Sequence, residues 1–147
     1  MAKSKFNAPT DQHEREPVVG AQLVVPPNAL IGSWGACDAR TRGLVRVDLS
    51  ASGGGLKVHV FGACTPTPCD WGTVDGIAYA ASVSDTEAIA FSAFYKFDFK
   101  NTIVTGRIDN GTLIVETYNQ FTDGSARSDY YSRGYFCRQT QRVGKAK

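Results

Sequence analysis

The sequence predicts an all-β protein: an antiparallel up-and-down β-barrel of about eight strands with an N-terminal arm. Three observations lead to this prediction. Short segments of alternating apolar and polar residues follow one another from residue 31 to residue 138. Gly, Asn and Asp gather in the short connections between these segments. No connection is as long as the crossover that a two-sheet sandwich, the main alternative, normally needs, and a closed barrel leaves no strand edge exposed.

Length and composition indicate one domain. The chain has 147 residues, of which 42% are hydrophobic, enough to build a core without a metal. We expect the barrel at residues 31–138, an arm or flexible tail at 1–30, and a basic tail at 139–147. The net charge of +2 predicts neither a nucleic-acid nor a membrane partner. No signal peptide or membrane-spanning run is visible, so we expect a soluble chain whose compartment is unknown.

The N-terminal arm contains Pro17, Gly20, Pro26 and Pro27, which prevent a continuous helix. Its second half, residues 18–25, is rich in valine and leucine. Two interpretations remain open: the arm docks on a neighbouring subunit, which gives self-association, or it is a loose leader.

The first half of the domain opens with a strand at 31–34. Alternation then predicts strands at 44–49 and 56–60, which form a hairpin around a glycine-rich turn. A weaker strand follows at 72–80.

The second half begins with an ambiguous segment at 88–99. Residues 84–87 match a helix capping box, but the segment is rich in aromatic residues, which favour a strand. We predict a strand. Residues 101–108 and 112–118 form the clearest hairpin, because Asp-Asn-Gly at 109–111 suits a tight turn. The closing strand is expected at 128–138.

Four cysteines permit three complete pairings. We favour Cys64 with Cys69, which closes a loop stiffened by prolines, and Cys37 with Cys137, which ties the first strand to the last. The longer link would add about 4 kcal/mol to stability on the loop-entropy model. Such bonds indicate an oxidising compartment. Reduced thiols remain the alternative, and a metal site that includes His59 is a minor one.

The segment around these cysteines carries a resemblance. Residues 62–72 read Gly-x-Cys-x-Pro-x-x-Cys-Asp-Trp-Gly, and together with Ile-Gly-Ser-Trp at 31–34 and Thr-Arg-Gly-Leu-Val-Arg at 41–46 they resemble a group of largely uncharacterised bacterial and fungal β-domains. That group implies no established activity. The early Gly-x-Trp, the strand count and Arg138 after the last strand are similar to the lipocalin and avidin superfamily. This second resemblance implies that a small hydrophobic or ring-shaped ligand binds in the barrel mouth.

Aromatic residues supply the candidate ligand site. Trp71 is the leading candidate because it follows a proline-rich loop at a strand end, where barrels bind ligands. Trp34 is expected to be buried at the barrel floor. Aromatic side chains in a small barrel also serve as core, and this alternative applies to every ring in the set. The predicted ligand-binding residues are Trp71, Asp70, Tyr79, Tyr95 and Tyr118.

Charged residues supply a rival hypothesis. One alternation phase of the strands carries Arg46, Asp48, Lys57, His59, Arg107 and Glu116. If this phase faced the lumen, it would provide an acid, a base and a cation for a barrel enzyme of the isomerase or cyclase type. The opposite phase is rich in valine, so we expect the charged phase to face solvent.

The sequence therefore favours a non-catalytic barrel that binds a small ligand or a protein partner at the end carrying residues 64–71. It shows no nucleophile motif, phosphate loop or cofactor signature, so no catalytic residue, cofactor or metal is assigned. The alternatives are an assembly module whose arm docks on neighbouring subunits, and the barrel enzyme.

Overall fold

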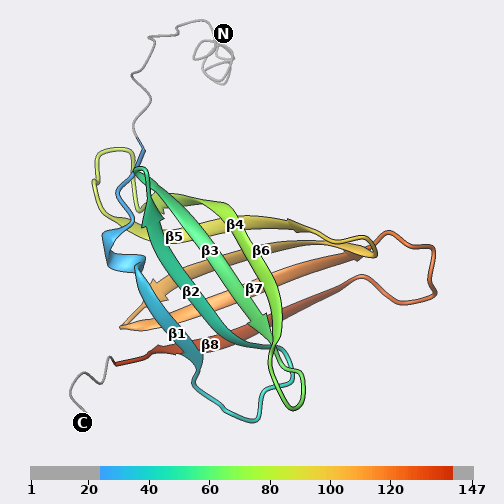
Figure 1. Cartoon of the computed structure of the whole chain (residues 1–147). Helices are drawn as coiled ribbons and strands as arrows, with labels where there is room; N and C mark the ends of the chain where they lie inside the picture. The colour runs from blue at the N-terminus through green and yellow to red at the C-terminus, as the bar shows by residue number, and fades with distance from the viewer. Residues whose placement is uncertain (1–23, 141–147) are drawn as a thin grey trace, which may run out of the picture.

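The computed structural model describes residues 24–140 and shows one closed barrel (Figure 1). Eight antiparallel strands follow one another around the barrel in chain order, and β8 pairs with β1 to close it. The predicted fold class is confirmed, and a closed eight-stranded barrel is compatible with the lipocalin and avidin resemblance. The elements are η1 (Asn28–Leu30), β1 (Gly32–Ala36), β2 (Leu44–Ser52), β3 (Gly55–Gly62), β4 (Cys69–Ala80), β5 (Ala88–Lys96), β6 (Lys100–Asp109), β7 (Thr112–Phe121) and β8 (Tyr130–Arg138).

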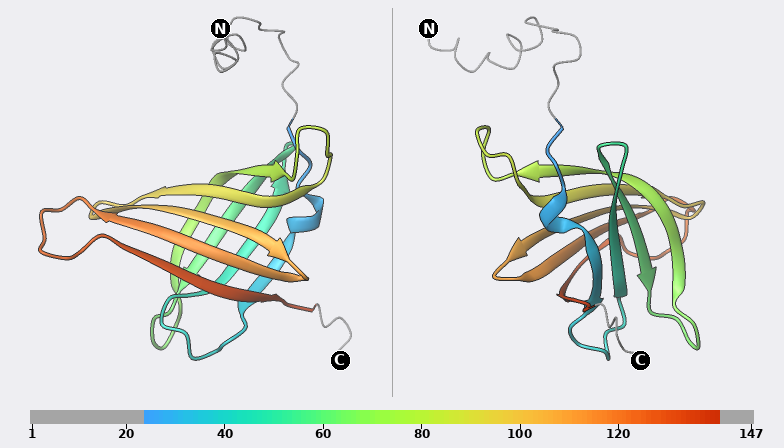
Figure 2. Two further views of the ribbon diagram at one scale, coloured as in Figure 1. Left: turned by 180° about the vertical axis from the view of Figure 1, so that it is seen from behind. Right: turned by 60° about the vertical axis from the view of Figure 1, so that its left-hand side comes forward.

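Up-and-down connectivity places alternate connections at opposite ends. We call the end with η1 and the β2–β3, β4–β5 and β6–β7 connections the floor, and the end with the β1–β2, β3–β4, β5–β6 and β7–β8 connections the mouth. The later strands run steeply across the earlier ones, and the β7–β8 connection projects beyond the barrel (Figures 1 and 2). Among residues 24–140 no helix is both long and apolar enough to span a bilayer.

The turns follow the backbone freedom of their residues. At the β6–β7 turn, Asn110 has φ 55° and Gly111 has φ 81°, conformations that glycine and asparagine adopt at low cost. The strands on either side pair without interruption from Asp109 opposite Thr112 to Lys100 opposite Phe121.

The ambiguous segment at 88–99 is mostly strand, with β5 covering Ala88–Lys96. Phe91, Ala93 and Tyr95 alternate inward and are buried. A helix would spread these three side chains around its circumference, whereas the strand sends all three into the core. Aromatic content therefore indicated the conformation correctly, and the capping-box match did not.

Period-2 alternation separates core from surface. The inward apolar side chains include Val47, Leu49, Leu56, Val58, Val60, Val104 and Val115, each at most 3% exposed. The charged phase lies outside, where Arg46 pairs with Asp48 at 2.9 Å and Lys57 pairs with Asp75. The hypothesis of a lumenal acid–base site built from this phase is wrong, because filling the interior with valine and leucine removes more apolar surface from water.

The floor is sealed by Trp34, which is 1% exposed, as the sequence predicted. Its indole Nε1 donates to the carbonyl of Leu30 at 3.0 Å. The Arg138 guanidinium lies over the ring, 4.2 Å from its centroid, and donates to the carbonyls of Ile31 and Ala29. The first strand, the last strand and η1 are thus joined at one point.

Both predicted disulfides are present. Cys37 and Cys137 have Cα atoms 5.2 Å apart and are separated by 100 residues, and Cys64 and Cys69 have Cα atoms 5.4 Å apart. Two disulfides are consistent with an oxidising compartment.

The predicted arm boundary at residue 30 falls inside the barrel body. Leu30 in η1 is fully buried, and Val25 packs against the core. Residues 1–23 of the arm and 141–147 of the basic tail lie outside the described residues.

Candidate functional site

The Cys-Asp-Trp-Gly segment at the start of β4 forms a bulge that sets the mouth. The β3–β4 register shifts between His59 and Phe61, and Gly72 has φ 88°, which favours glycine. Asp70 Oδ1 accepts the Gly72 N–H at 2.8 Å and the His59 Nε2–H at 2.6 Å. The hydrogen bond from His59 holds the pKa of Asp70 below its usual range. Asp70 therefore holds the bulge from outside.

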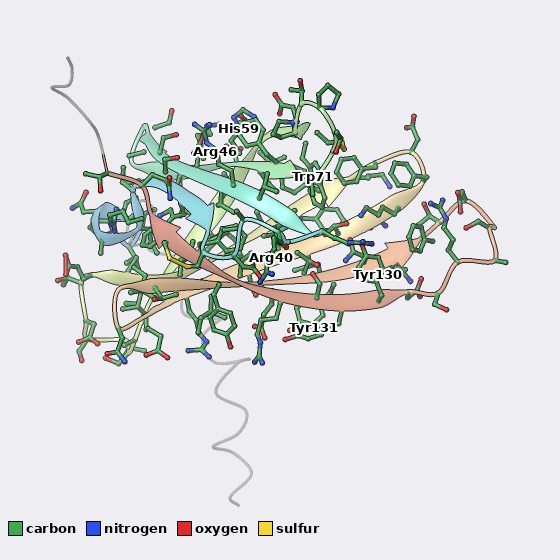
Figure 3. All side chains as sticks on the ribbon, turned by 90° about the horizontal axis from the view of Figure 1, so that it is seen from below. Arg40, Arg46, His59, Trp71, Tyr130 and Tyr131 are labelled. Carbon is green, nitrogen blue, oxygen red and sulfur yellow. A yellow bond between two sulfur atoms is a disulfide. The ribbon has the colours of Figure 1, made fainter. Side chains whose placement is uncertain are left out.

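The bulge turns Trp71 inward. Figure 3 shows Trp71 on the inner side of β4, while His59 and Arg46 lie on the outer side of the neighbouring strands. Its ring makes edge contacts with Tyr95 and Phe97, with centroids 5.5 and 5.2 Å apart. Phe97 stacks in turn on Phe99 at 5.7 Å. We call these four rings the aromatic cluster; such pairs contribute about 0.5–1.5 kcal/mol each beyond their burial.

A buried lysine lies against this cluster. Lys100, the first residue of β6, is only 7% exposed. Its Nζ lies 4.8 Å from the Trp71 ring centroid and between 5.8 and 6.0 Å from those of Phe97, Tyr130 and Phe99. Ring faces attract a cation, and they do so most strongly where water is excluded.

Lys100 begins a chain of polar side chains along the inner wall of β6, β7 and β8. Its Nζ donates to Asn119 Oδ1 at 2.9 Å, and Thr102 Oγ1 donates to the same oxygen at 2.8 Å. Asn119 Nδ2 donates to Thr117 Oγ1 at 3.0 Å, and the hydroxyls of Thr117 and Ser132 share a hydrogen bond of 2.6 Å. This polar chain interrupts an interior that is otherwise mostly apolar.

The far end of the polar chain borders a pocket of about 140 Å³. The β1–β2 connection covers it through Thr41 and Gly43, and the inner faces of β7 and β8 contribute Thr117, Ser132 and Phe136. An apolar cavity of about this size accommodates benzene in another protein. The pocket therefore offers room for one ring beside two hydroxyl groups.

Burial shifts the pKa values of Lys100 and Tyr95, the two titratable groups of the inner mouth, in the directions that favour their uncharged forms. It lowers the pKa of Lys100, and the nearby positive charge of Arg127 lowers it further. It raises the pKa of Tyr95 to about 12. The Tyr95 hydroxyl donates to the carbonyls of Gly72 and Val58 at 2.8 and 3.1 Å, so this ring braces the bulge.

The structure brings together only part of the predicted ligand set. Trp71 and Tyr95 are in contact at the mouth, although Tyr95 is 2% exposed and belongs to the core. Asp70 lies outside, beneath the bulge. Tyr79 is on the outer wall of β4 and bonds to Ser92. Tyr118 is on the outer wall of β7, so neither outer tyrosine faces the lumen.

Tyr118 belongs to a row of exposed apolar side chains across four strands. Phe94, Ile103, Tyr118 and Tyr131 are register partners from β5 to β8 and are each about half exposed. In Figure 3, Tyr131 lies outside β8 while Tyr130 lies inside it. This row is separate from the mouth.

Sequence reasoning missed the polar chain. Lys100 precedes Thr102 and Val104 in the inward phase of β6, so alternation alone could have placed it inside. The contribution of Asn119 and Ser132 could not be found that way, because short polar residues are ordinary near strand ends. Comparisons of the chain with protein-family models, curated proteins and solved structures give no match.

Proposed function

We propose that the protein is a non-catalytic small β-barrel that binds a small ligand inside its mouth, along the polar chain that runs from the aromatic cluster to the pocket. The observation that carries the proposal is the contrast within the lumen. The floor half is packed with apolar side chains, whereas the mouth combines four rings, a buried cation and a pocket of about 140 Å³. Convergent polar groups in an apolar recess are typical of ligand sites.

The buried polar side chains at the mouth make the fold less stable than an apolar wall would. A buried ammonium is costly even when its hydrogen bonds are made. Replacing such groups by apolar ones is often neutral or stabilising. The presence of these buried polar side chains at the mouth therefore supports recognition of a ligand rather than packing.

Native mass spectrometry of the protein purified from its source tests this proposal. We expect a discrete extra mass that is lost on denaturation. The variant Trp71→Ala should fold, because its ring is only partly buried, but should lose the extra mass. Tyr118→Ala on the outer wall is the matched control and should keep it. A folded Trp71→Ala protein that retains the ligand would contradict the proposal.

A second candidate is an assembly module that associates through its N-terminal arm. The observation that favours it is a groove of about 710 Å³ at the floor, lined by Val24, Val25 and Pro26 together with the exposed Val83 of the β4–β5 connection. Removing residues 1–23 leaves these groove residues in place. If the arm assembles the protein, the truncated chain should form particles with fewer subunits, counted by light scattering; an unchanged number of subunits would reject this candidate.

A further inference from the structure

The charge balance of the mouth identifies the class of ligand. Lysine is almost never buried unless it is paired, and its usual partner is a carboxylate. Among residues 24–140, every ion pair lies on the outer wall or in a connection, and none involves Lys100. The inner mouth therefore holds a positive charge that no described carboxylate balances.

The hydrogen bonds of Lys100 are also incomplete. An ammonium has three N–H donors, and the only acceptor that the described residues offer is Asn119 Oδ1. The ring faces of Trp71, Phe97 and Tyr130 attract the charge without accepting a conventional hydrogen bond. Two donors thus remain for a group that enters the mouth.

Thr117 and Ser132 supply one more donor at the pocket. Their hydroxyls share a single hydrogen bond, and Thr117 Oγ1 also accepts from Asn119. Whichever hydroxyl donates in the shared bond, the hydrogen of the other stays free. An acceptor in the pocket can therefore be bound there, separated along the polar chain from the ammonium by Asn119.

We propose that the ligand is a small carboxylate with an apolar or aromatic body, whose anionic group pairs with Lys100. This inference rests on the proposed function, since it concerns the same site. One buried ammonium balances one negative charge, which suits a carboxylate. Phosphate esters carry up to two charges and are typically held by several donors or by bidentate arginine. Arg127, the other cation nearby, is already bound to Asp123 at 2.7 Å.

The apolar body of the ligand matches the other groups of the mouth. The pocket accommodates about one ring, and the exposed edge of the aromatic cluster, Phe99, offers a surface for stacking. Lowering of the Lys100 pKa by burial would be reversed when an anion binds beside it, because an opposite charge favours the ammonium.

The experiment compares benzoate with benzamide, which has the same shape but no charge. Both are titrated into the full-length protein and followed by calorimetry. We expect benzoate to bind at least about tenfold more tightly than benzamide, since losing one partner of a desolvated charge pair costs that much or more. This preference is measured on the unmodified protein and so does not depend on any variant folding.

Two variants then assign the preference to Lys100. Lys100→Met keeps an unbranched apolar stem and removes the charged end, and it should lower benzoate affinity to that of benzamide. Lys96→Met, an exposed lysine at the end of β5, is the matched control and should keep the preference. Lys100→Arg retains a cation and should keep a measurable preference even if Lys100→Met is unstable.

The outcomes separate the two claims. If both probes bind equally and Trp71→Ala abolishes both, the carboxylate inference is wrong and the proposed function stands. If neither probe binds the unmodified protein, the inference of a small aromatic carboxylate is wrong, and the proposed function is decided separately by the extra mass in native mass spectrometry. A preference for benzoate that survives Lys100→Met would also overturn the inference.

Discussion

The two ends of the barrel each place a cation over a tryptophan, and they do so for different reasons. At the floor, Arg138 covers Trp34 and donates to two backbone carbonyls. At the mouth, Lys100 covers Trp71, but it is buried and has one side-chain acceptor. Arg138 is exposed, so its remaining N–H groups face water, whereas Lys100 is buried and two of its donors have no acceptor among the described residues. We propose that similar ring–cation geometry serves structure at the floor and ligand recognition at the mouth.

The largest expected effect is at the floor. Trp34→Ala removes a ring that is 1% exposed and an indole N–H bonded to Leu30. Loss of such a ring typically costs about 3–5 kcal/mol in the free energy of unfolding. Trp71→Ala should cost clearly less, because that ring is only partly buried. Urea denaturation of both variants measures the difference, and equal losses would remove the distinction between the two ends.

The two disulfides should also differ in how much each contributes to stability. On the loop-entropy model the bond spanning 100 residues, Cys37–Cys137, adds about 4–5 kcal/mol, and the five-residue Cys64–Cys69 link adds about 2 kcal/mol. Replacing each pair by serine and measuring thermal unfolding checks the order. The long link should matter more to stability, and the short one more to ligand affinity, because it holds the loop before Trp71.

The cations themselves give a sharper comparison. Arg138→Met should destabilise the fold by about 1–3 kcal/mol, because it removes two hydrogen bonds from a charged donor, to the carbonyls of Ile31 and Ala29. Lys100→Met should leave the stability unchanged or raise it, since an unbalanced buried charge is replaced by an apolar side chain. Denaturation curves of the two variants test this. A marked loss of stability in Lys100→Met would show that the lysine serves the fold.

The smallest effect is a dependence on pH. Burial lowers the pKa of folded Lys100 below its ordinary 10.5, so the unfolded chain binds the proton more tightly. Stability relative to Lys100→Met should therefore rise as the pH increases from the folded pKa towards 10.5. Tyr95, whose pKa is raised to about 12, has the opposite effect between pH 10 and pH 12. Because both proteins contain Tyr95, the difference between them isolates Lys100, and a falling difference would contradict the account.

The fold and the floor were predictable from the sequence because their signals are local. Alternation located most of the strands and aromatic content located the one at 88–99, Asn110 and Gly111 identified a tight turn, and the early Gly-x-Trp indicated a buried ring at the floor. The disulfide pairing also followed from strand order. Each of these depends on neighbours in the chain or on the closure of a barrel.

The mouth was only partly predictable because its groups come from five strands, β4 to β8. Trp71 was found from the loop before it, but Asp70 was assigned to the ligand when its role is to hold the bulge from outside. Tyr79 and Tyr118 were chosen for their rings, and their strand phase places them on the outer wall. A lysine at position 100 does not by itself indicate a ligand site. The proposal for Lys100 depends on its contacts with Trp71, Phe97 and Asn119, which only the structure shows.

The most direct test of the distinction between the two ends uses the fact that the chain has only two tryptophans. Full-length protein labelled with 5-fluorotryptophan gives one ¹⁹F resonance from each ring, and Trp71→Phe assigns them. We predict that adding benzoate shifts the Trp71 resonance and leaves that of Trp34 in place. A shift of Trp34 alone, or no shift of either ring while calorimetry shows binding, would place the ligand elsewhere and contradict the account.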